Sequence, residues 1–301
     1  MHLLTFKCNK ELKSKNRTRG AVLYNWFTFM EVNSVRGSDG ELLASGGHDK
    51  EPNATHEGHS MVITDVRFSP ALGFLATSSI DKTVRVWDTD NFLHHCVATF
   101  AAWLFSSYVY WTPLWYNFTD FHPIKDDLIC SCDWSGEIRY WTINDGSCAG
   151  VFKGGNYQVR FQPCLGRYLA AASDDVLSIM DVEKQTCLYS MKGHIKPISY
   201  LCWDPSGTLL ASLSEDSIRI WTFTPGNEGR CVHQLNGENF FSCAFHPTHP
   251  WLLASLVIWD TIENKRMSIS AHKGIISWLA ASGVSGFIAS TSHDNFLKLR
   301  R

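Results

Sequence analysis

The chain has 301 residues, a net charge of −2 at pH 7 and a sequence pI of about 6.7. Hydrophobic residues make up 45% and charged residues 19%, which excludes a disordered chain, because disorder goes with low hydrophobicity and high charge. The near-neutral balance argues against a dedicated nucleic-acid-binding domain, which is usually basic on one face. We therefore expect no direct sequence-specific binding of nucleic acid.

The first 25 residues are interpreted as a basic, disordered tail, and residues 26–301 as one folded domain. The apolar start, Met1–Phe6, is too short for a secretory signal, and basic residues follow it: Lys7, Lys10, Lys13, Lys15, Arg17 and Arg19. Such a run is a nuclear address in some proteins and a solvated tail in others. Both interpretations remain open.

A short strand motif recurs along the rest of the chain, built from β-branched and aromatic residues. Its clear copies, VRVWD, EIRYW and SIRIW, end at Asp88, Trp141 and Trp221, and its weaker copies end at Asp181, Asp260 and Arg300. From Trp141 onward the copies follow one another at 39, 41, 38 and 41 residues, close to the roughly 40–45 residues of a WD40 repeat. The interval from Trp87 to Trp141 is 54 residues, so this unit contains an insertion.

Two further markers occur before strand motifs, the first of them before three motifs only. The first is a small residue followed by histidine, as in Gly58-His59, Gly193-His194 and Ala271-His272. The second is an aromatic residue followed by a proline turn, and an apolar strand follows each copy. The aromatic residue and the proline occupy positions 68–70, 121–123, 161–163, 203–205 and 245–247. Strand, turn, strand, turn, strand is the pattern of one propeller blade. The sequence therefore predicts an all-β, WD40-type β-propeller.

Polar residues at the markers are predicted to form one network per blade. In WD40 repeats, which this pattern resembles, the matching residues form a buried chain from Trp through Ser and His to Asp. The sets in this sequence are His59, Ser79, Asp81 and Trp87; His194, Ser214, Asp216 and Trp221; and His272, Ser292 and Asp294, with Arg300 in place of Trp. A buried polar network is stable when every member is paired, and it then fixes strand and loop in one arrangement.

Ser, His and Asp also suggest a hydrolase triad. A catalytic triad does not recur three times in one chain at the same spacing, whereas a structural unit must, so the network is interpreted as structural. The sequence contains no GxSxG, P-loop or HExxH motif. Ten cysteines occur without a CxxC pair, and Cys130 and Cys132 form only a CxC, which favours free thiols over a zinc site. We predict no enzyme activity, catalytic residue, cofactor or metal.

The units number seven, so the prediction is a seven-bladed WD40 propeller with blades one and six incomplete and an aromatic insertion in blade three. Blade one lacks its Trp strand after Lys50, and blade six has a short turn before VIWD (257–260). A ring must join its ends, because an open edge strand promotes aggregation. The segment 27–32 alternates in polarity and is predicted to close the ring by pairing with the last blade.

Long segments resemble the propeller of the plant LEUNIG family of transcriptional co-repressors. They are FTFMEVNSVR (27–36), LLASGGHDK (42–50), ITDVRFSP (63–70), LATSSIDKTVRVWD (75–88), DDLICSCD (126–133), GEIRYWTIN (136–144), GRYLAAASDDVLSIMDVE (166–183) and CWDPSGTLLASLSEDSIRIW (202–221). The resemblance implies a nuclear scaffold whose partners are DNA-bound transcription factors, adaptor co-repressors, and Mediator or histone deacetylase machinery. The family's N-terminal dimerising region and glutamine-rich stretch have no counterpart in these 301 residues, so we expect a truncated and partly degenerate form of the family's propeller.

The largest departure from the family is residues 101–118, an uncharged aromatic run. It is long enough to be read as a membrane span, but polar residues and Pro113 interrupt it and it falls within a blade. We expect no membrane partner. Residues 114–118 are predicted to supply the inner strand of blade three, which leaves 101–113 as an exposed aromatic insertion.

Two non-enzymatic functions remain. The first is the co-repressor scaffold that the resemblance implies. The alternative is a substrate receptor of a cullin-type ubiquitin ligase, a class that often carries arginine at the fourth position of a WDxR motif. The matching positions here hold Asp90, Thr224 and Ile262, which favours the scaffold.

Overall fold

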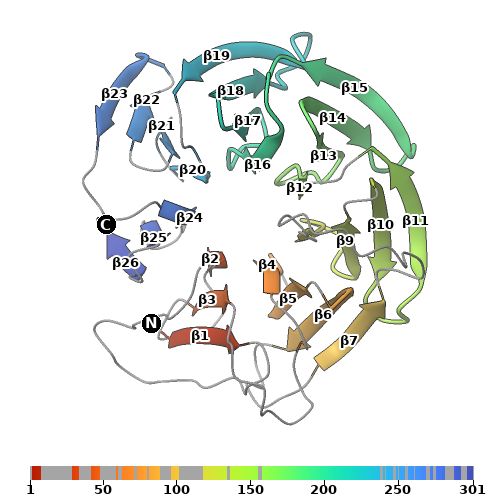
Figure 1. The fold of residues 1–301 in the computed structure, drawn as a ribbon. Coiled ribbons are helices and arrows are strands. Elements are labelled where there is room, and N and C mark those ends of the chain that lie inside the picture. Colours follow the sequence, from red (N-terminus) through yellow and green to blue (C-terminus); the bar gives the residue numbers. More distant parts are fainter. Residues whose placement is uncertain are drawn as a thin grey trace.

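The computed structural model contains only β-strands as regular elements within the residues it describes. These are residues 2–7, 29–33, 42–47, 59, 63–70, 73–79, 81–88, 96–101, 118–133, 136–154, 158–237, 240, 242–246, 249, 251–254, 257–260, 262–268, 272–273, 276–281, 288–292 and 297–300. The strands form seven sheets, five of them four-stranded. The sheets are arranged around a ring in chain order (Figure 1), the arrangement of a β-propeller.

Blades two to six are the four-stranded sheets, numbered by the sequence units to which they correspond. Blade two is β4 (Ile63–Phe68), β5 (Phe74–Ser79), β6 (Thr83–Asp88) and β7 (Cys96–Ala101). Blade three is β8 (Phe118–Phe121), β9 (Leu128–Cys132), β10 (Glu137–Thr142) and β11 (Cys148–Lys153). Blade four is β12 (Gln158–Phe161), β13 (Tyr168–Ser173), β14 (Val176–Asp181) and β15 (Thr186–Lys192).

Blade five is β16 (Ile198–Trp203), β17 (Leu209–Ser214), β18 (Ser217–Thr222) and β19 (Arg230–Asn236). Blade six is β20 (Cys243–Phe245), β21 (Trp251–Ala254), β22 (Val257–Asp260) and β23 (Lys265–Ser268). The last sheet is β24 (Ile276–Ala281), β25 (Ile288–Ser292) and β26 (Leu297–Arg300). The first sheet, with the order β1-β3-β2, comprises β1 (His2–Lys7), β2 (Phe29–Asn33) and β3 (Leu42–Gly47).

Burial changes steadily from the centre of the ring to its rim. The innermost strand of blade four, β12, is buried along its whole length, whereas the outermost strands β11, β15 and β19 expose most of their side chains. Inner strands are covered by both neighbouring blades, so they need apolar residues on both faces. Alanines 170–172 in β13 show the same constraint, because all three are fully buried. One apolar cluster includes residues from every sheet from β4–β7 to β24–β26.

The start of the chain differs from the prediction. Strand β2 overlaps the segment expected to close the ring, but it pairs antiparallel with β3 and is hydrogen-bonded to no strand of the last sheet. Pairing with a segment about ten residues away closes a far shorter loop than pairing with the end of the chain, and so costs less entropy. Strand β1 lies within the expected tail and pairs parallel with β3. The domain boundary at residue 26 stays a prediction.

Blade six was expected to lack a strand, but it has four. They are only three or four residues long, so the close spacing of LLASL and VIWD shortens the strands without removing one. In blade three the inner strand is β8, which begins at Phe118, the last residue of the predicted strand. Residues 102–117 lie outside the described residues, and so do residues 48–58, where blade one was expected to lack a strand.

Candidate functional site

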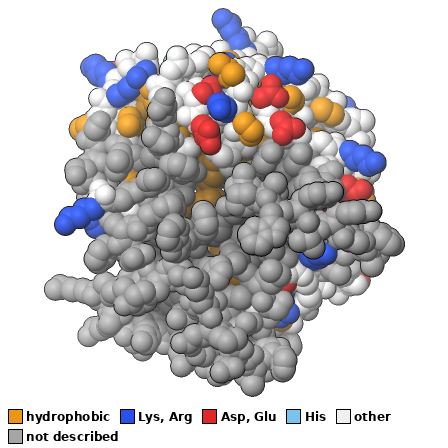
Figure 2. Space-filling view, in the orientation of Figure 1, with side chains coloured by type: hydrophobic (Ala, Val, Ile, Leu, Met, Phe, Trp, Pro, Cys, Tyr) orange, Lys and Arg blue, Asp and Glu red, His pale blue; other side chains and the backbone are white. Residues whose placement is uncertain are grey.

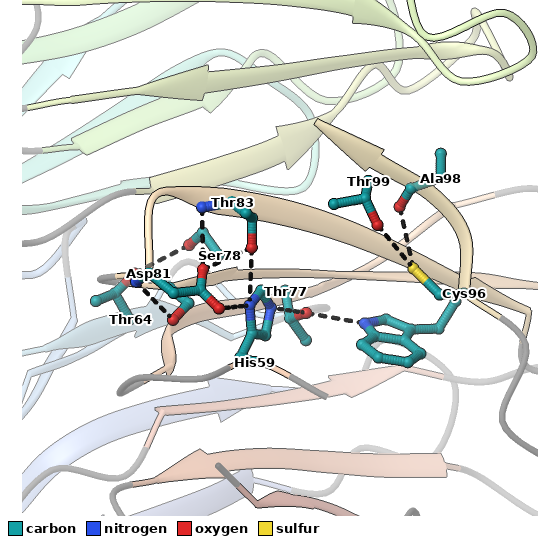
Figure 3. A network of polar contacts seen from close by, with 11 residues as sticks. His59, Thr64, Thr77, Ser78, Asp81, Thr83, Cys96, Ala98 and Thr99 are labelled. Carbon is teal, nitrogen blue, oxygen red and sulfur yellow. Dashed lines mark hydrogen bonds and ion pairs between the residues drawn. The ribbon is translucent and has the colours of Figure 1, made fainter. Parts of the chain in front are cut away.

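Blade two contains a buried chain of hydrogen bonds that links two loops to the sheet (Figure 3). The indole N–H of Trp87 donates to Thr77 Oγ1 at 2.8 Å, and Thr77 Oγ1 lies 2.8 Å from His59 Nε2. His59 Nδ1 lies 2.9 Å from Asp81 Oδ2. Because the carboxylate is an acceptor, Nδ1 carries the proton and Nε2 accepts from Thr77. Every proton in the chain then points from Trp87 toward Asp81.

Asp81 also organises its own turn. Its Oδ1 accepts the N–H of Thr83 at 3.0 Å, and its N–H donates to Ser79 Oγ at 3.1 Å. His59, Ser79 and Trp87 are all buried. The network therefore holds the histidine loop, the β5–β6 turn and the centre of the blade in one arrangement.

Blade five repeats the chain with a different ending. Trp221 Nε1 donates to Ser212 Oγ at 2.8 Å, and Ser212 Oγ lies 2.7 Å from His194 Nε2. His194 Nδ1 lies 3.1 Å from Ser217 Oγ, which donates to Asp216 Oδ2 at 2.9 Å. Ser217 thus stands between the histidine and the carboxylate.

The environment of His194 disfavours its charged form. Burial, with the nearby Arg219 charge, lowers the pKa of His194 to about 4. For Asp216, burial opposes ionisation, but the hydrogen bond from the Ser217 hydroxyl and the neighbouring Ser214 hydroxyl leave the pKa below its usual value. Blade five therefore holds a neutral histidine beside a carboxylate at pH 7.

The third predicted set is present in part. His272 Nε2 lies 2.8 Å from Ser290 Oγ in the last sheet, and Ser292 is buried. Asp294 lies outside the described residues. Blade three keeps the other half of the chain, because Trp141 Nε1 donates to Ser131 Oγ at 2.9 Å although no Gly-His marker precedes this blade.

The hydroxyl that joins tryptophan to histidine was predicted two residues too late. It belongs to Thr77 and Ser212, where the prediction named Ser79 and Ser214. In the β5–β6 pair Trp87 stands opposite Leu75 and Arg85 opposite Thr77, which makes Thr77 the diagonal neighbour of Trp87. Diagonal cross-strand neighbours are within reach of a large side chain, whereas a residue two pairs further along is not. Counting the register back from the turn predicts this position.

Ser79 and Ser214, the serines that the prediction named, form other hydrogen bonds near the turns. Ser79 accepts the N–H of Asp81, and Ser214 donates to the Lys196 carbonyl at 2.9 Å, which ties the histidine loop to β17. In blade six the position that matches Thr77 is Ala254, and Trp259 donates instead to Asn264 Oδ1 at 2.9 Å. Blade four has Ala171 and Met180 at the hydroxyl and tryptophan positions.

A second set of polar contacts, which the sequence analysis missed, joins neighbouring blades. On an innermost strand, or immediately before it in the case of Ser242, a side-chain acceptor receives a backbone N–H from the innermost strand of the next blade. The pairs are Thr119 N to Asp65 Oδ2 at 3.3 Å, Phe161 N to Asp120 Oδ2 at 2.8 Å, Leu201 N to Gln158 Oε1, and Leu279 N to Ser242 Oγ at 3.0 Å. The available signal was a polar residue within an apolar inner strand, as at Asp65, Asp120 and Gln158.

Charge reinforces these contacts around blades two to four. Arg160 Nη1 lies 3.2 Å from Asp65 Oδ2, and both side chains are almost fully buried. Burial raises the pKa of Asp120, and the charges of Arg160 and Arg67 oppose that rise. A buried charge is tolerated only when it is paired, so this cluster fixes the order and spacing of the inner strands.

The histidine networks are suited to a structural role. The hydroxyls of Thr77 and Ser212 are fully buried and already engaged by tryptophan and histidine, so they are not presented to a substrate. No cluster of three or more metal-ligating side chains occurs among the described residues. Within the same residues the structure contains no helix long and apolar enough to cross a membrane.

Comparison with known proteins agrees with this architecture. Residues 50–88 and 185–222 match the family described as WD domain, G-beta repeat. The transcriptional corepressor LEUNIG_HOMOLOG of Arabidopsis thaliana is 40% identical over 91% of this chain and 37% of its own length. Human Striatin-4 is 26% identical over 64% of this chain and 26% of its length. Pre-mRNA-processing factor 19 of Oryza sativa subsp. japonica is 26% identical over 60% of this chain and 36% of its own length.

The chain thus spans between 26% and 37% of the length of these relatives. Three observations indicate the same family. They are the hydrogen-bonded chains from tryptophan through a hydroxyl to histidine, the ring of sheets in chain order, and the match to the family model. The chain belongs to the WD40-repeat proteins, and over most of its length it is similar to a transcriptional corepressor.

Proposed function

We propose that the chain is a seven-bladed, non-enzymatic protein-interaction scaffold that acts in the nucleus as a module of a transcriptional co-repressor. The single observation that carries this proposal is the 40% identity to LEUNIG_HOMOLOG over 91% of the chain. In this proposal DNA-bound transcription factors recruit the module, and adaptor co-repressors, Mediator or histone deacetylase subunits receive the signal. The module makes no sequence-specific contact with DNA and none with membranes.

The end of the ring that carries the histidine loops is the proposed docking face. In blades four and five the loop 193–197 lies beside the β13–β14 turn, because Ile198 N donates to the Asp174 carbonyl at 2.7 Å. Ile195 is 83% exposed there, and Asp174, Asp175 and Glu215 are exposed around it. Figure 2 shows acidic side chains beside hydrophobic ones in the upper part of the view, where Figure 1 places β14–β19. An apolar anchor within a polar rim is typical of a protein-binding surface.

A tethering experiment tests this function. The full chain fused to a heterologous DNA-binding domain should repress a reporter, and Ile195→Asp should remove most of that repression. The matched control is Leu165→Asp, because Leu165 is 67% exposed in the β12–β13 turn at the opposite end of the strands. Affinity purification of the tagged chain from nuclear extract should recover Mediator or histone deacetylase subunits. Recovery of cullin-ligase adaptors without repression would overturn the proposal.

A further inference from the structure

Two histidines face each other in the turn between the first two strands of blade six. His246 follows β20 directly, and His249 is three residues further along the chain. Their Nδ1 atoms lie 3.1 Å apart, the ring centroids are 4.6 Å apart, and the ring planes cross at 77°. His246 is partly exposed and His249 is exposed. Two ring nitrogens therefore meet at a surface that a dissolved ion can reach.

The equivalent turn in blade three shows why the two rings meet. His122 follows β8 as His246 follows β20, and its Nδ1 accepts the backbone N–H of Lys125, three residues later, at 2.9 Å. In blade six the Nδ1 of His246 accepts the backbone N–H of His249, again three residues later, at 3.2 Å. The turn therefore brings the third residue after the first histidine close to that ring. This residue is a lysine in blade three and a second imidazole in blade six.

The hydrogen bonds fix the tautomer of His246. Because its Nδ1 accepts the backbone N–H of His249, that nitrogen carries no proton. The Nδ1–H of His249 then donates to the same atom, so a single proton lies between the two nitrogens. Burial, with the charge of His249, lowers the pKa of His246 and favours its neutral form at pH 7. Neutral imidazole is the form of histidine that binds metal ions.

We propose that His246 and His249 form a surface site for a divalent transition-metal ion of the class that imidazole binds, Zn²⁺, Cu²⁺ or Ni²⁺. The ion takes the place of the proton between the two Nδ1 atoms, and His249 carries its proton on Nε2 instead. Imidazole nitrogens bound about 2.05 Å from a tetrahedral ion lie about 3.3 Å apart, so the observed 3.1 Å needs little movement. Coordination also replaces the 3.2 Å hydrogen bond from the His249 N–H. Water occupies the remaining positions of the ion.

This metal site is separate from the proposed docking face. Its turn joins the innermost and second strands of blade six, at the end of the strands away from the histidine loops. A bound ion therefore restrains the β20–β21 turn without contact to Ile195. The expectation that the chain binds no metal rested on the cysteine spacing and on the missing HExxH motif, and neither bears on this pair.

Calorimetric titration of the full chain with Ni²⁺ alone tests the site. His249→Lys gives blade six the residue that blade three has at this position, so it keeps the turn and removes one ligand. It should weaken Ni²⁺ binding at least about tenfold, because even an outer partner of a metal ligand contributes that much. His246→Gln should weaken binding equally. The matched control is His233→Gln, which removes a histidine that packs on the Trp259 ring and should leave the affinity unchanged.

Nuclear magnetic resonance locates the bound ion. Cu²⁺ binds nitrogen sites more tightly than Ni²⁺ or Zn²⁺ does, and it broadens the resonances of nearby protons. Less than one equivalent of Cu²⁺ should broaden the ring signals of His246 and His249 before those of His122 and His233. The two variants assign the signals, because each lacks one of them.

Four results would overturn the site. The first is a chain that does not bind Ni²⁺, and the second is an equal affinity in the unsubstituted chain and in His249→Lys. The third is a loss in His233→Gln as large as that in His246→Gln. The fourth is binding that persists in both histidine variants and disappears when the exposed thiols are alkylated, which would show an adventitious thiol complex only. These thiols are Cys148, Cys164 and Cys187.

Discussion

The polar networks of blades two and five begin alike and end differently. Both join tryptophan to histidine through a strand hydroxyl, at 2.8 and 2.8 Å in blade two and 2.8 and 2.7 Å in blade five. In blade two the histidine contacts its carboxylate directly at 2.9 Å, whereas in blade five Ser217 intervenes. The turn that carries the aspartate is one residue shorter in blade five.

The comparison separates what is essential to the network from what is adjustable. The hydroxyl next to tryptophan occurs in blades two, three and five, so the centre of the blade sets this contact. The link to aspartate depends on the turn, which changes length without disturbing the sheet. Four substitutions or conditions sharpen this distinction, and they follow in order of expected effect.

Removing the strand hydroxyl should destabilise most. Thr77→Val keeps the shape of the side chain but leaves the Trp87 N–H and His59 Nε2 without their bridging hydroxyl in a buried site. The unfolding free energy should fall by about 2–5 kcal/mol, the combined penalty for two buried polar groups. Chemical denaturation followed by tryptophan fluorescence measures it. Ser79→Ala is the control, expected to cost about 1 kcal/mol for one turn contact; a larger loss from Ser79→Ala than from Thr77→Val would contradict the assignment.

Acid should weaken blade five through His194. Its pKa is about 4 in the folded chain and near 6.5 when unfolded, so the unfolded state binds the proton more readily. The stability contributed by neutral His194 is complete above pH 6.5 and is lost as the pH falls toward 4. The difference in unfolding free energy should reach about 3 kcal/mol at most. The same pH series on His194→Gln isolates this contribution from the carboxylates; parallel stability curves for the two proteins would rule out the buried neutral histidine.

These two predictions show where sequence reasoning succeeded and where it stopped. The periodic strand motif predicts the ring of sheets, because alternating residues and turn prolines specify strands locally. It also places His59 with Trp87 in the network of blade two, and His194 with Trp221 in that of blade five. The bridging hydroxyl was misplaced because Thr77 and Ser79 lie two apart on one strand, and only the cross-strand register selects between them.

Contacts between blades were beyond sequence reasoning for a related physical reason. Asp65 meets Arg160 across 95 positions in the chain, and no local pattern encodes that distance. The role predicted for the segment 27–32 failed because a nearby strand competed for the same edge. Local periodicity predicts elements, whereas register and competition between edges decide their partners.

Removing the aspartate should cost less in blade five than in blade two. Asp81→Ala deletes a direct contact with His59 and the acceptor for Thr83, whereas Asp216→Ala deletes a partly exposed group that contacts Ser217. Asp216→Ala is expected to lower the unfolding free energy by roughly 1–3 kcal/mol, and Asp81→Ala by the upper part of that range. Thermal melts of both variants provide the comparison. An unchanged melt for Asp216→Ala would show that the serine bridge contributes nothing.

The smallest effect concerns the backbone of the longer turn. Lys82 follows Asp81 with φ of 70°, in the left-handed region that costs a non-glycine residue free energy, whereas neither residue of the described turn 215–216 in blade five has a positive φ. Lys82→Gly removes that strain but also gives the unfolded chain more freedom, so the net gain should be about 0.5 kcal/mol. Glu215→Gly in blade five relieves no strain and should destabilise by a similar amount. Paired denaturation curves measure both; a loss of stability in Lys82→Gly equal to that in Glu215→Gly would show that the longer turn bears no backbone strain, and that the direct His59–Asp81 contact is formed without it.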